Sequence, residues 1–380
     1  MKKLLPEVCT IQYGFPFDSA KFSDSNGTPL IRIRDVVRGY SETYTTEEYK
    51  SEYIVHENDL LIGMDGEFNI AKWGKTPALL NQRVCRLAPK DSIDKDYLFY
   101  FMPIALKRIE EKTPFVTVKH LSAKELNKIE IPVLSLEEQR KIAETLSKVD
   151  ELIAFREQQL AKLDELVKAR FVEMFGDLVA PQCEYPELKL VDICADADDI
   201  KCGPFGTQLN RDEYKAKGVA VWEIPQINSG FSEMPTHFIT EEKAVILNAY
   251  SIEPGDIAMS RKGNVGKCGL FPENLKKGII HSDVLRIRVD KRKVDSCFMM
   301  YQLHFSEAVK RQIEMVSSGV IMAGINVTKL KQIKVRIPEL ENQRMFAAFV
   351  ERVDQQKQRV QKSLEKLELM KKALMQEYFG

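Results

Sequence analysis

Two stretches of the chain carry apolar residues at a seven-residue spacing, which is typical of long helices that pack in pairs. In both stretches one apolar set is unbroken, and a second set is interrupted mainly by lysine or arginine. The unbroken sets are Leu146, Ile153, Leu160, Val167 and Met174 in the first stretch, and Phe346, Val353, Val360, Leu367 and Leu374 in the last. At about 1.5 Å per residue, each stretch predicts a helix about 50–60 Å long. A coiled coil is favoured over two amphipathic helices that each pack only on a globular domain.

The two heptad stretches begin and end alike. Each begins with a proline and then a Gln-Arg pair, in IPVLSLEEQRKIA at 131–143 and IPELENQRMFA at 337–347. When Gln139 is aligned with Gln343, the Phe-Gly pair at 175–176 meets the Phe-Gly pair at 379–380 without a gap. Proline disfavours helix just before it, and glycine often ends a helix. The repeat therefore indicates duplication of a whole domain together with the helix that follows it.

The order domain, helix, domain, helix has a geometric consequence. If the first helix delivers the second domain at its far end, the second helix must run back to pair with the first. The expected register places Leu146 opposite Leu374, Ile153 opposite Leu367 and Leu160 opposite Val360. The basic residues of the interrupted sets are then expected opposite apolar residues. The predicted fold class is α+β, with two mixed α/β domains at opposite ends of a long antiparallel two-helix coiled coil and an approximate two-fold axis.

The two globular segments, residues 1–130 and 180–336, share faint landmarks in the same order. The landmarks are GFPF at 14–17 and GPFG at 203–206, LIRIRDV at 30–36 and VAVWEIPQI at 219–227, ENDLLIGMDG at 57–66 and EPGDIAMSRKG at 253–263, and NQRVCRL at 81–87 and HSDVLRIRV at 281–289. Both segments read as strands separated by turns, followed by a helix-like stretch. Their divergence within a shared order predicts two copies of one domain with different surface chemistry.

Composition is that of an ordinary globular protein, with 44% apolar and 29% charged residues and a formal net charge of +0. A nucleic-acid partner would therefore require basic residues gathered on one face. The 7 cysteines are scattered without metal-ligand spacing, as expected of incidental thiols in a reducing compartment. Neither a signal peptide nor an apolar run long enough to span a membrane is evident. A cytoplasmic location is the expectation.

The whole layout resembles the specificity subunit of a type I restriction–modification system. The residues that carry the resemblance are IPVLSLEEQRKI with FGD, IPELENQR with the final FG, and the Asp-Leu-Leu and Asp-Ile segments at 59–61 and 256–257. The resemblance implies target-recognition domains at 1–134 and 177–339, and conserved helices at 135–176 and 340–380. It also implies binding of double-stranded DNA at an asymmetric bipartite site, with the spacer set by the helices. Expected partners are two modification (methyltransferase) subunits and the restriction (translocase/endonuclease) subunits, and neither a cofactor nor a metal is expected.

The strongest candidates for DNA contact lie in the basic loop of the second domain. Arginine can read guanine, asparagine and glutamine can read adenine, and lysine can hold phosphate. The candidates in this domain are Phe205, Thr207, Gln208, Gln226, Asn228, Arg261, Lys262, Asn264, Lys267, Ser317, Ser318 and Asn326. A solvated basic hairpin remains an open interpretation of the loop, and its spacing does not fit a nucleotide-binding GxxxxGK[ST] motif.

The first domain offers a less basic set. Alternation along a strand would place Arg32 and Arg34 on one face, suited to phosphate, although a charged edge strand is the alternative. The candidates here are Phe15, Arg32, Arg34, Arg38, Asn69, Lys72, Thr117, Lys119 and His120.

Catalytic signatures are weak throughout the sequence. Neither a [DN]PP[YF] methyltransferase motif nor a GxGxxG loop is present, and Glu241-Glu242-Lys243 is a nuclease-like ExK that occurs often by chance. A subunit without catalysis of its own is therefore predicted. Two other hypotheses stay open at this point: a coiled-coil interaction protein whose globular ends bind proteins, and a stand-alone enzyme that uses the ExK carboxylates.

Overall fold

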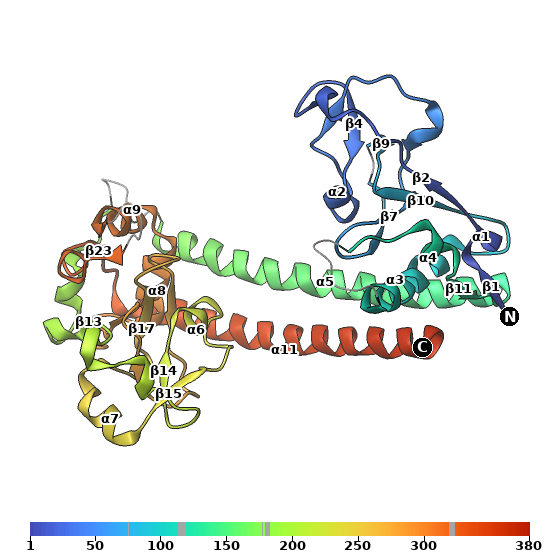
Figure 1. Ribbon diagram of the computed structural model, residues 1–380. Coiled ribbons are helices and arrows are strands. Elements are labelled where there is room, and N and C mark those ends of the chain that lie inside the picture. The colour runs from blue at the N-terminus through green and yellow to red at the C-terminus, as the bar shows by residue number, and fades with distance from the viewer. Residues whose placement is uncertain (75, 113–118, 177, 179–182, 319–323) are drawn as a thin grey trace. The chain divides into compact units, whose positions relative to one another are not determined.

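The computed structural model describes residues 1–380 except 75, 113–118, 177, 179–182 and 319–323. The chain divides into two compact units (Figure 1). The first unit comprises Met1–Gln158 with Gln361–Gly380, and the second comprises Gln159–Val360. The two long helices, α5 (Leu136–Phe175) and α11 (Leu340–Phe379), each contribute to both units. Each unit is thus one globular domain together with part of each long helix.

The first globular domain is built on small sheets. Their strands are β1 (Lys2–Leu4), β2 (Cys9–Tyr13), β3 (Phe22–Ser23), β4 (Thr28–Ile31), β5 (Tyr44–Thr45), β6 (Ile54–Val55), β7 (Leu60–Gly63), β8 (Asn69–Lys72), β9 (Ala78–Leu80), β10 (Val84–Pro89) and β11 (Glu130–Pro132). The orders are β1-β11, β2-β10-β7-β8 and β3-β5-β4-β9-β6. The α-helices among its described residues are α1 (Leu5–Val8), α2 (Ile33–Arg38), α3 (Lys95–Lys112) and α4 (Ala123–Asn127).

The second globular domain repeats this topology. Its strands are β12 (Glu187–Lys189), β13 (Ile200–Cys202), β14 (Val219–Trp222), β15 (His237–Ile239), β16 (Ser251–Ile252), β17 (Ile257–Ser260), β18 (Cys268–Leu270), β19 (Gly278–Ile280), β20 (Val284–Ile287), β21 (Ser317–Ser318), β22 (Gly324–Ile325) and β23 (Lys334–Arg336). Its helices are α6 (Ile224–Asn228), α7 (Glu241–Ile246), α8 (Ser296–Phe305), α9 (Glu307–Val316) and α10 (Val327–Leu330). The sheets β12-β23, β13-β20-β17-β18 and β15-β14-β19-β16 correspond in order to those of the first domain, where β3 is an additional edge strand of the third sheet. The β4–β9 pair and the β14–β19 pair are both parallel.

The segment after β4 forms a short helix and does not continue as a strand. The backbone N–H of Arg32 donates to Oδ2 of Asp35 at 2.8 Å, which is half of a capping box. Gly39 then ends α2 with a φ of 75°. The prediction that Arg32 and Arg34 share one face of a strand is therefore wrong. Local capping by Asp35 and Gly39 ends the strand at Ile31.

Each long helix ends inside the hydrophobic core of a domain. Phe175, at the end of α5, is buried in the core of the second unit with its ring centroid 4.7 Å from that of Phe298. Phe379, at the end of α11, is buried in the core of the first unit, 5.3 Å from the ring centroid of Tyr97. Tyr97 lies in α3 and Phe298 in α8, the helices that hold corresponding places in the two domains. The repeated Phe-Gly pair is therefore part of the domain cores as well as a helix end.

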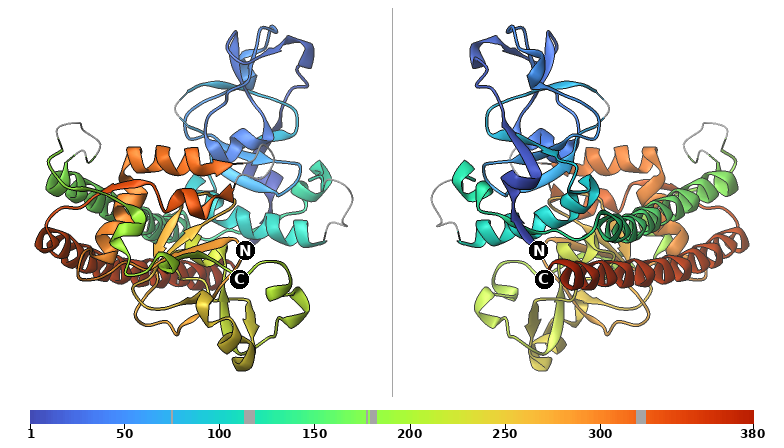
Figure 2. Two further views of the ribbon diagram at one scale, coloured as in Figure 1. Left: turned by 90° about the vertical axis from the view of Figure 1, so that its left-hand side faces the viewer. Right: turned by 90° about the vertical axis from the view of Figure 1, so that its right-hand side faces the viewer.

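The helices α5 and α11 run antiparallel within each unit, as Figures 1 and 2 show. In the first unit, Nζ of Lys371 lies 2.6 Å from Oδ1 of Asp150. In the second unit, Nζ of Lys357 lies 2.6 Å from Oδ1 of Asp164. The later residue of α5 pairs with the earlier residue of α11, as antiparallel helices require. Both contacts agree with the predicted register.

The basic residues that interrupt the heptads have polar partners. Both lysines just named reach carboxylates, and Nε of Arg156 donates to Oγ of Ser363 at 3.2 Å. A half-buried charge needs a polar partner. Each of these partners is the sequence neighbour of the apolar residue predicted to lie opposite, namely Leu163 for Lys357, Val149 for Lys371 and Leu364 for Arg156. Nη1 of Arg170 pairs with Oε2 of Glu173 on the same helix at 2.8 Å, and its guanidinium carbon lies 5.8 Å from the ring centroid of Phe349.

The repeated Gln-Arg pair places a fully buried glutamine near the start of each long helix. Oε1 of Gln139 accepts a hydrogen bond from the backbone N–H of Asp94 at 2.7 Å, and Oε1 of Gln343 accepts from that of Asp295 at 2.9 Å. Each amide nitrogen donates to a carbonyl of the segment before its helix, at 2.9 and 2.7 Å. Both aspartates cap the next helix, α3 or α8, through their side chains. The glutamine therefore ties each long helix to a globular domain.

Gln343→Ala should destabilise the protein by about 1–3 kcal/mol, because it leaves a buried backbone donor and a buried carbonyl without partners. Urea unfolding followed by circular dichroism measures the change. Gln356→Ala is the matched control, since Gln356 is exposed on the same helix and its loss should change stability by less than about 0.5 kcal/mol. Equal stabilities of the two variants would contradict the assigned role.

No helix in the part of the chain that the structure describes combines the length and the apolar character needed to cross a bilayer.

Candidate nucleic-acid interface

Both domains hold a glycine against the turn that leads into their central antiparallel sheet. A Cβ on Gly14 would stand 1.9 Å from the carbonyl oxygen of Asn81, in the turn between β9 and β10. A Cβ on Gly203 would stand 2.3 Å from the carbonyl oxygen of His281, in the turn between β19 and β20. Only glycine allows so close an approach of two backbones. The GFPF and GPFG segments are thereby fixed beside equivalent turns.

In the second domain, Arg261 joins three segments that are far apart in the sequence. Its guanidinium carbon lies 4.9 Å from the ring centroid of Phe205, a cation–π contact. Its Nε donates to the carbonyl of Ile325 at 3.2 Å, and its backbone N–H donates to the carbonyl of Asp283 at 2.8 Å. The basic loop, the GPFG segment, the turn before β20 and the β21–β22 ribbon therefore form one cluster, called here the second loop cluster.

Two lysines extend the second loop cluster. Nζ of Lys262 lies 2.9 Å from Oδ1 of Asp283, and Nζ of Lys267 donates to the carbonyl of Asn228 at 2.9 Å. The second contact brings in the end of α6. Other predicted residues that are exposed in these segments are Thr207, Gln208, Asn228 and Asn264. Basic and amide side chains predicted from four separate motifs thus come together.

Gln226 is the exception among the predicted residues of these segments. Its side chain is 2% exposed, its Oε1 accepts from the backbone N–H of Glu223 at 3.1 Å, and its Nε2 donates to the carbonyl of Met234 at 3.3 Å. The prediction that Gln226 reads a base is contradicted by this burial. The side chain caps α6 from inside the domain, as Asp35 caps α2 in the first domain.

The remaining predicted residues of the second domain lie at the β21–β22 ribbon. Oδ1 of Asn326 accepts from the backbone N–H of Lys329 at 3.0 Å and caps α10. Oγ of Ser317 donates to the carbonyl of Ile313 at 2.8 Å. Ser318 pairs through its backbone in the ribbon, and its side chain lies outside the described residues. The ribbon contributes mainly backbone to the cluster.

The first domain assembles a corresponding cluster with different charges. Oδ1 of Asp65 lies 2.5 Å from Nδ1 of His120 and 3.5 Å from Nη1 of Arg83. The backbone N–H of Gln82 donates to the carbonyl of Phe15 at 2.9 Å. The loop after β7, the turn before β10, the GFPF segment and the segment before α4 therefore meet, and they are called here the first loop cluster.

Two predicted lysines of the first domain are engaged elsewhere. Nζ of Lys72 lies 2.9 Å from Oδ1 of Asp96 and 5.0 Å from the ring centroid of Phe99. Nζ of Lys119 donates to the carbonyl of Glu110 at 3.0 Å. Both lysines thus reach residues of α3, and the structure does not bring their ammonium groups into the first loop cluster.

The other predicted residues of the first domain have mixed placements. Asn69 begins β8, and its Nδ2 donates to the carbonyl of Glu67 at 3.3 Å. Three predicted arginines at the start of α2 or within it have exposed side chains: Arg32, Arg34 and Arg38. Nε of Arg34 lies 3.6 Å from Oδ1 of Asp35, and Nη1 of Arg38 lies 3.7 Å from Oε2 of Glu42. Thr117 lies outside the described residues.

The sequence reasoning missed Asp65, Gln82 and Arg83, which lie within the first loop cluster. The motif NQRVCRL served only as a landmark shared by the two domains, whereas Asn81, Gln82 and Arg83 form the turn before β10. Asn at the start of the motif, before the apolar alternation, was an available turn signal. Its counterpart HSDVLRIRV begins with a turn in the same way.

The thiols beside the second loop cluster are neutral. Burial raises the pKa of Cys268 to about 12. Burial also raises the pKa of Cys202, against the opposing effect of the Arg261 guanidinium. Because both thiols stay protonated near pH 7, neither adds a negative charge that would offset the basic loop.

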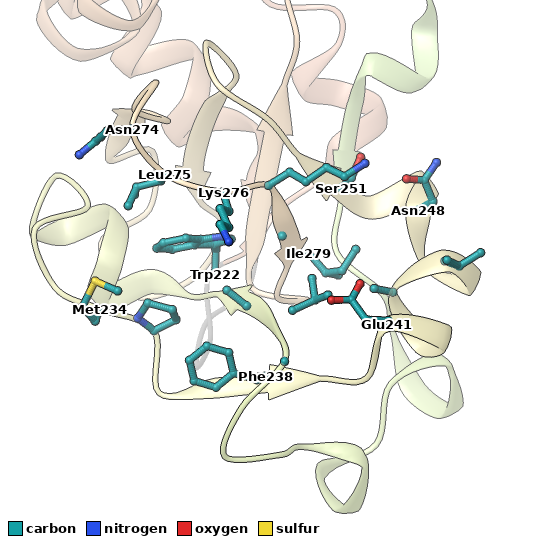
Figure 3. Close-up of a pocket in the computed structure, with 18 residues that line it drawn as sticks. Trp222, Met234, Phe238, Glu241, Asn248, Ser251, Asn274, Leu275, Lys276 and Ile279 are labelled. Carbon is teal, nitrogen blue, oxygen red and sulfur yellow. The ribbon is translucent and has the colours of Figure 1, made fainter.

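A pocket of about 850 Å³ lies elsewhere in the second domain and is lined by residues of β14, β15, β19 and α7 (Figure 3). It includes Trp222, Phe238 and Glu241 but none of the residues predicted to contact DNA. In the ExK motif, Nζ of Lys243 pairs with Oε1 of Glu213 at 2.6 Å. Among the described residues, no group of three or more His, Cys, Asp or Glu side chains is placed to hold a metal ion.

Two divergent copies of one domain, joined by paired helices and each carrying a loop cluster with basic and amide side chains, define a two-domain nucleic-acid recognition protein. The chain belongs to the type I restriction modification DNA specificity domain family, whose profile matches residues 1–165 and 199–369. Members of this family are the DNA-recognition components of type I restriction enzymes and are not themselves catalytic. The coiled-coil interaction protein considered above is not favoured.

Relatives match along nearly the whole chain. The chain is 28% identical over 376 residues to the type I restriction enzyme EcoBI specificity subunit of Escherichia coli, covering 92% of this chain and 78% of that protein. It is 25% identical over 379 residues to the MjaVIII specificity subunit of Methanocaldococcus jannaschii, covering 91% and 87%.

Solved structures share the fold. The S subunit of a type I restriction–modification system from M. genitalium has a TM-score of 0.59 at 17% identity, covering 99% of this chain and 94% of that one. A chain from a study of complex assembly and conformational transition of the type I R-M system has a TM-score of 0.61 at 17% identity, covering 100% and 97%. These likenesses support the predicted fold class, in which two mixed α/β domains are linked by long helices.

Proposed function

We propose that this chain recognises an asymmetric bipartite site in double-stranded DNA, with one half-site read by each loop cluster. The observation that carries the proposal is that equivalent loops converge in both domains but present different side chains. In this assignment residues 1–134 and 177–339 are the target-recognition domains. Residues 135–176 and 340–380 are the conserved helices that set the spacer.

Each loop cluster has the side chains that DNA recognition requires. Major-groove edges distinguish all four base pairs, and arginine, asparagine and glutamine make the base contacts that discriminate among them. Lysine contacts to phosphate fix orientation but carry no sequence information. Arg261, Asn264 and Gln208 are therefore assigned to base edges, and Lys262 and Lys267 to the backbone. A net charge of +0 is compatible with this proposal because Arg261, Lys262 and Lys267 gather in one loop cluster.

The helices are proposed to serve as spacer and as docking surface. In type I systems the specificity subunit assembles with two modification (methyltransferase) subunits and with restriction (translocase/endonuclease) subunits, and we extend both partnerships to this chain. The charged outer faces of α5 and α11 are the proposed contact for the modification subunits. The proposed location is the cytoplasm, where such a complex meets DNA and where the seven free thiols remain reduced.

Methylation mapping tests the proposal. When the chain is produced with the modification subunits of its own system, long-read sequencing should find methylated bases in an asymmetric two-part motif with a gap of fixed length. Binding of the complex to a duplex with this motif should weaken steeply with salt, with a log–log slope of about −0.9 per phosphate contact.

A continuous motif would contradict the assignment of one half-site to each domain. Absence of methylation, or binding that is independent of salt, would contradict DNA recognition itself.

A further inference from the structure

Arg83 adopts a backbone conformation that arginine rarely takes. Its φ is 71°, and only Asn58 and Phe231 share a positive φ among the described residues other than glycine. In this left-handed region a side chain is strained, and glycine or asparagine would be easier to accommodate. The arginine lies in the turn before β10, within the first loop cluster. Strain of this kind concentrates at functional sites.

The side chain of Arg83 is half exposed and only partly engaged. Nη1 lies 3.5 Å from Oδ1 of Asp65 and 3.1 Å from Nδ1 of His120. Among the described residues, Nε and Nη2 of Arg83 have no hydrogen-bond partner. The guanidinium is therefore held along one edge while the donors needed for a bidentate contact remain open.

The contacts of Arg83 orient its guanidinium without using all of its hydrogen-bond donors. Nδ1 of His120 lies close to both Asp65 and Arg83. A single ring nitrogen either donates to the carboxylate or accepts from the guanidinium, so it cannot satisfy both neighbours at once. The guanidinium is thus oriented before DNA arrives, which lowers the entropy lost on binding.

The equivalent position in the second domain, Asp283, accepts the same backbone hydrogen bond but carries the opposite charge and lacks the positive φ. Met64 donates its backbone N–H to the carbonyl of Arg83 at 2.9 Å, and Arg261 donates to that of Asp283 at 2.8 Å. The ion pair is reversed, since Asp65 with Arg83 in the first domain corresponds to Lys262 with Asp283 in the second. A position that keeps its place and its backbone hydrogen bond in both domains but changes its charge suits a specificity-determining residue.

We propose that Arg83 is a specificity-determining residue, which donates to O6 and N7 of a guanine in the half-site read by the first domain. The inference rests on the proposed function and deepens it. Bidentate contact with guanine is the commonest specific contact of arginine in the major groove.

The test uses the complex of the chain with its modification subunits. Methylation is mapped for the wild type, Arg83→Ala and Arg83→Lys, and binding is measured on duplexes that vary each base of the first half-site. Both variants should lose discrimination at one guanine by roughly 5- to 150-fold, the range expected for one bidentate pair. Lysine should fail to restore the discrimination because its ammonium group lacks the planar, two-pronged donor arrangement of guanidinium. The second half-site should stay unchanged.

Three further variants separate recognition from folding. Arg83→Gly should raise the melting temperature, because it removes the backbone strain, and still lose the guanine preference. The double variant Asp65→Lys/Arg83→Asp restores an ion pair of the kind found in the second domain, yet should not regain the preference. Lys2→Ala removes one positive charge from an exposed part of the same domain and should leave discrimination unchanged.

The inference is overturned if Arg83→Ala keeps the first half-site intact or weakens all sequences equally, as loss of a phosphate contact would. Recovery of specificity in the double variant would also overturn it and assign a purely structural role. Failure of the proposed function looks different, because the wild type itself would then show no bipartite motif.

Discussion

Phe379→Ala should destabilise the first unit by about 3–5 kcal/mol while leaving the second unit nearly unchanged. Phe379 is only 5% exposed. Its ring centroid lies 5.3 Å from that of Tyr97 and 5.8 Å from that of Phe101. Truncation would leave a cavity in a core formed by α3 and the end of α11. Hydrogen exchange measured by mass spectrometry reports the stability of each unit separately, through peptides from α3 and α8.

Phe175→Ala is the matched counterpart. Phe175 is 4% exposed. In the second unit its ring centroid lies 4.7 Å from that of Phe298 and 5.7 Å from that of Phe346. Exchange should then accelerate in peptides from α8 and remain slow in those from α3. If either variant loosens both units equally, the division of the helices between two cores is incorrect.

Replacement of residues 180–336 by the corresponding domain of a relative with another target should change one half-site completely and preserve the other. The expectation follows from the proposed assignment of one half-site to each loop cluster. The donor domain must supply a backbone N–H for Oε1 of Gln343 and an aromatic residue for Phe175, as Asp295 and Phe298 do here. Methylation mapping of the chimaeric complex measures the outcome.

Reciprocal replacement of residues 1–130 provides the control and should change the other half-site. A donor domain that places neither a backbone N–H at Gln343 nor an aromatic ring at Phe175 should fold poorly, so thermal melting of each chimaera is measured first. Simultaneous change of both half-sites in a well-folded chimaera would contradict independent reading.

The long helices and the domain duplication were predictable because both depend on local periodicity. Apolar residues spaced by seven define the helices, and the repeated Gln-Arg and Phe-Gly pairs locate corresponding starts and ends. The antiparallel register also followed, since chain order leaves the second helix only one way to return. In contrast, the predicted strand at Arg32 and Arg34 failed because a cap at Asp35 and a left-handed Gly39 outweigh a short apolar alternation.

The candidate site was predictable in part. The GPFG segment, the basic loop and the end of α6 were identified separately by residue type, and the structure brings them together around Arg261. Gln226 was misassigned because its burial depends on contacts with residues outside its own motif. Arg83 was overlooked because neither its φ nor its distance to Asp65 is a local property of the sequence.

By itself, the sequence determined that two related domains alternate with two heptad helices, because periodicity and repeats survive as local patterns. The tertiary structure decided what those patterns do. It made the repeated glutamine a buried tie to the domain that precedes each long helix, the repeated phenylalanine a core residue, and the heptad lysines Lys357 and Lys371 partners of carboxylates. The physical reason is that burial, capping and ion pairing depend on contacts between segments that are distant in the sequence. Those contacts are defined only in the folded chain.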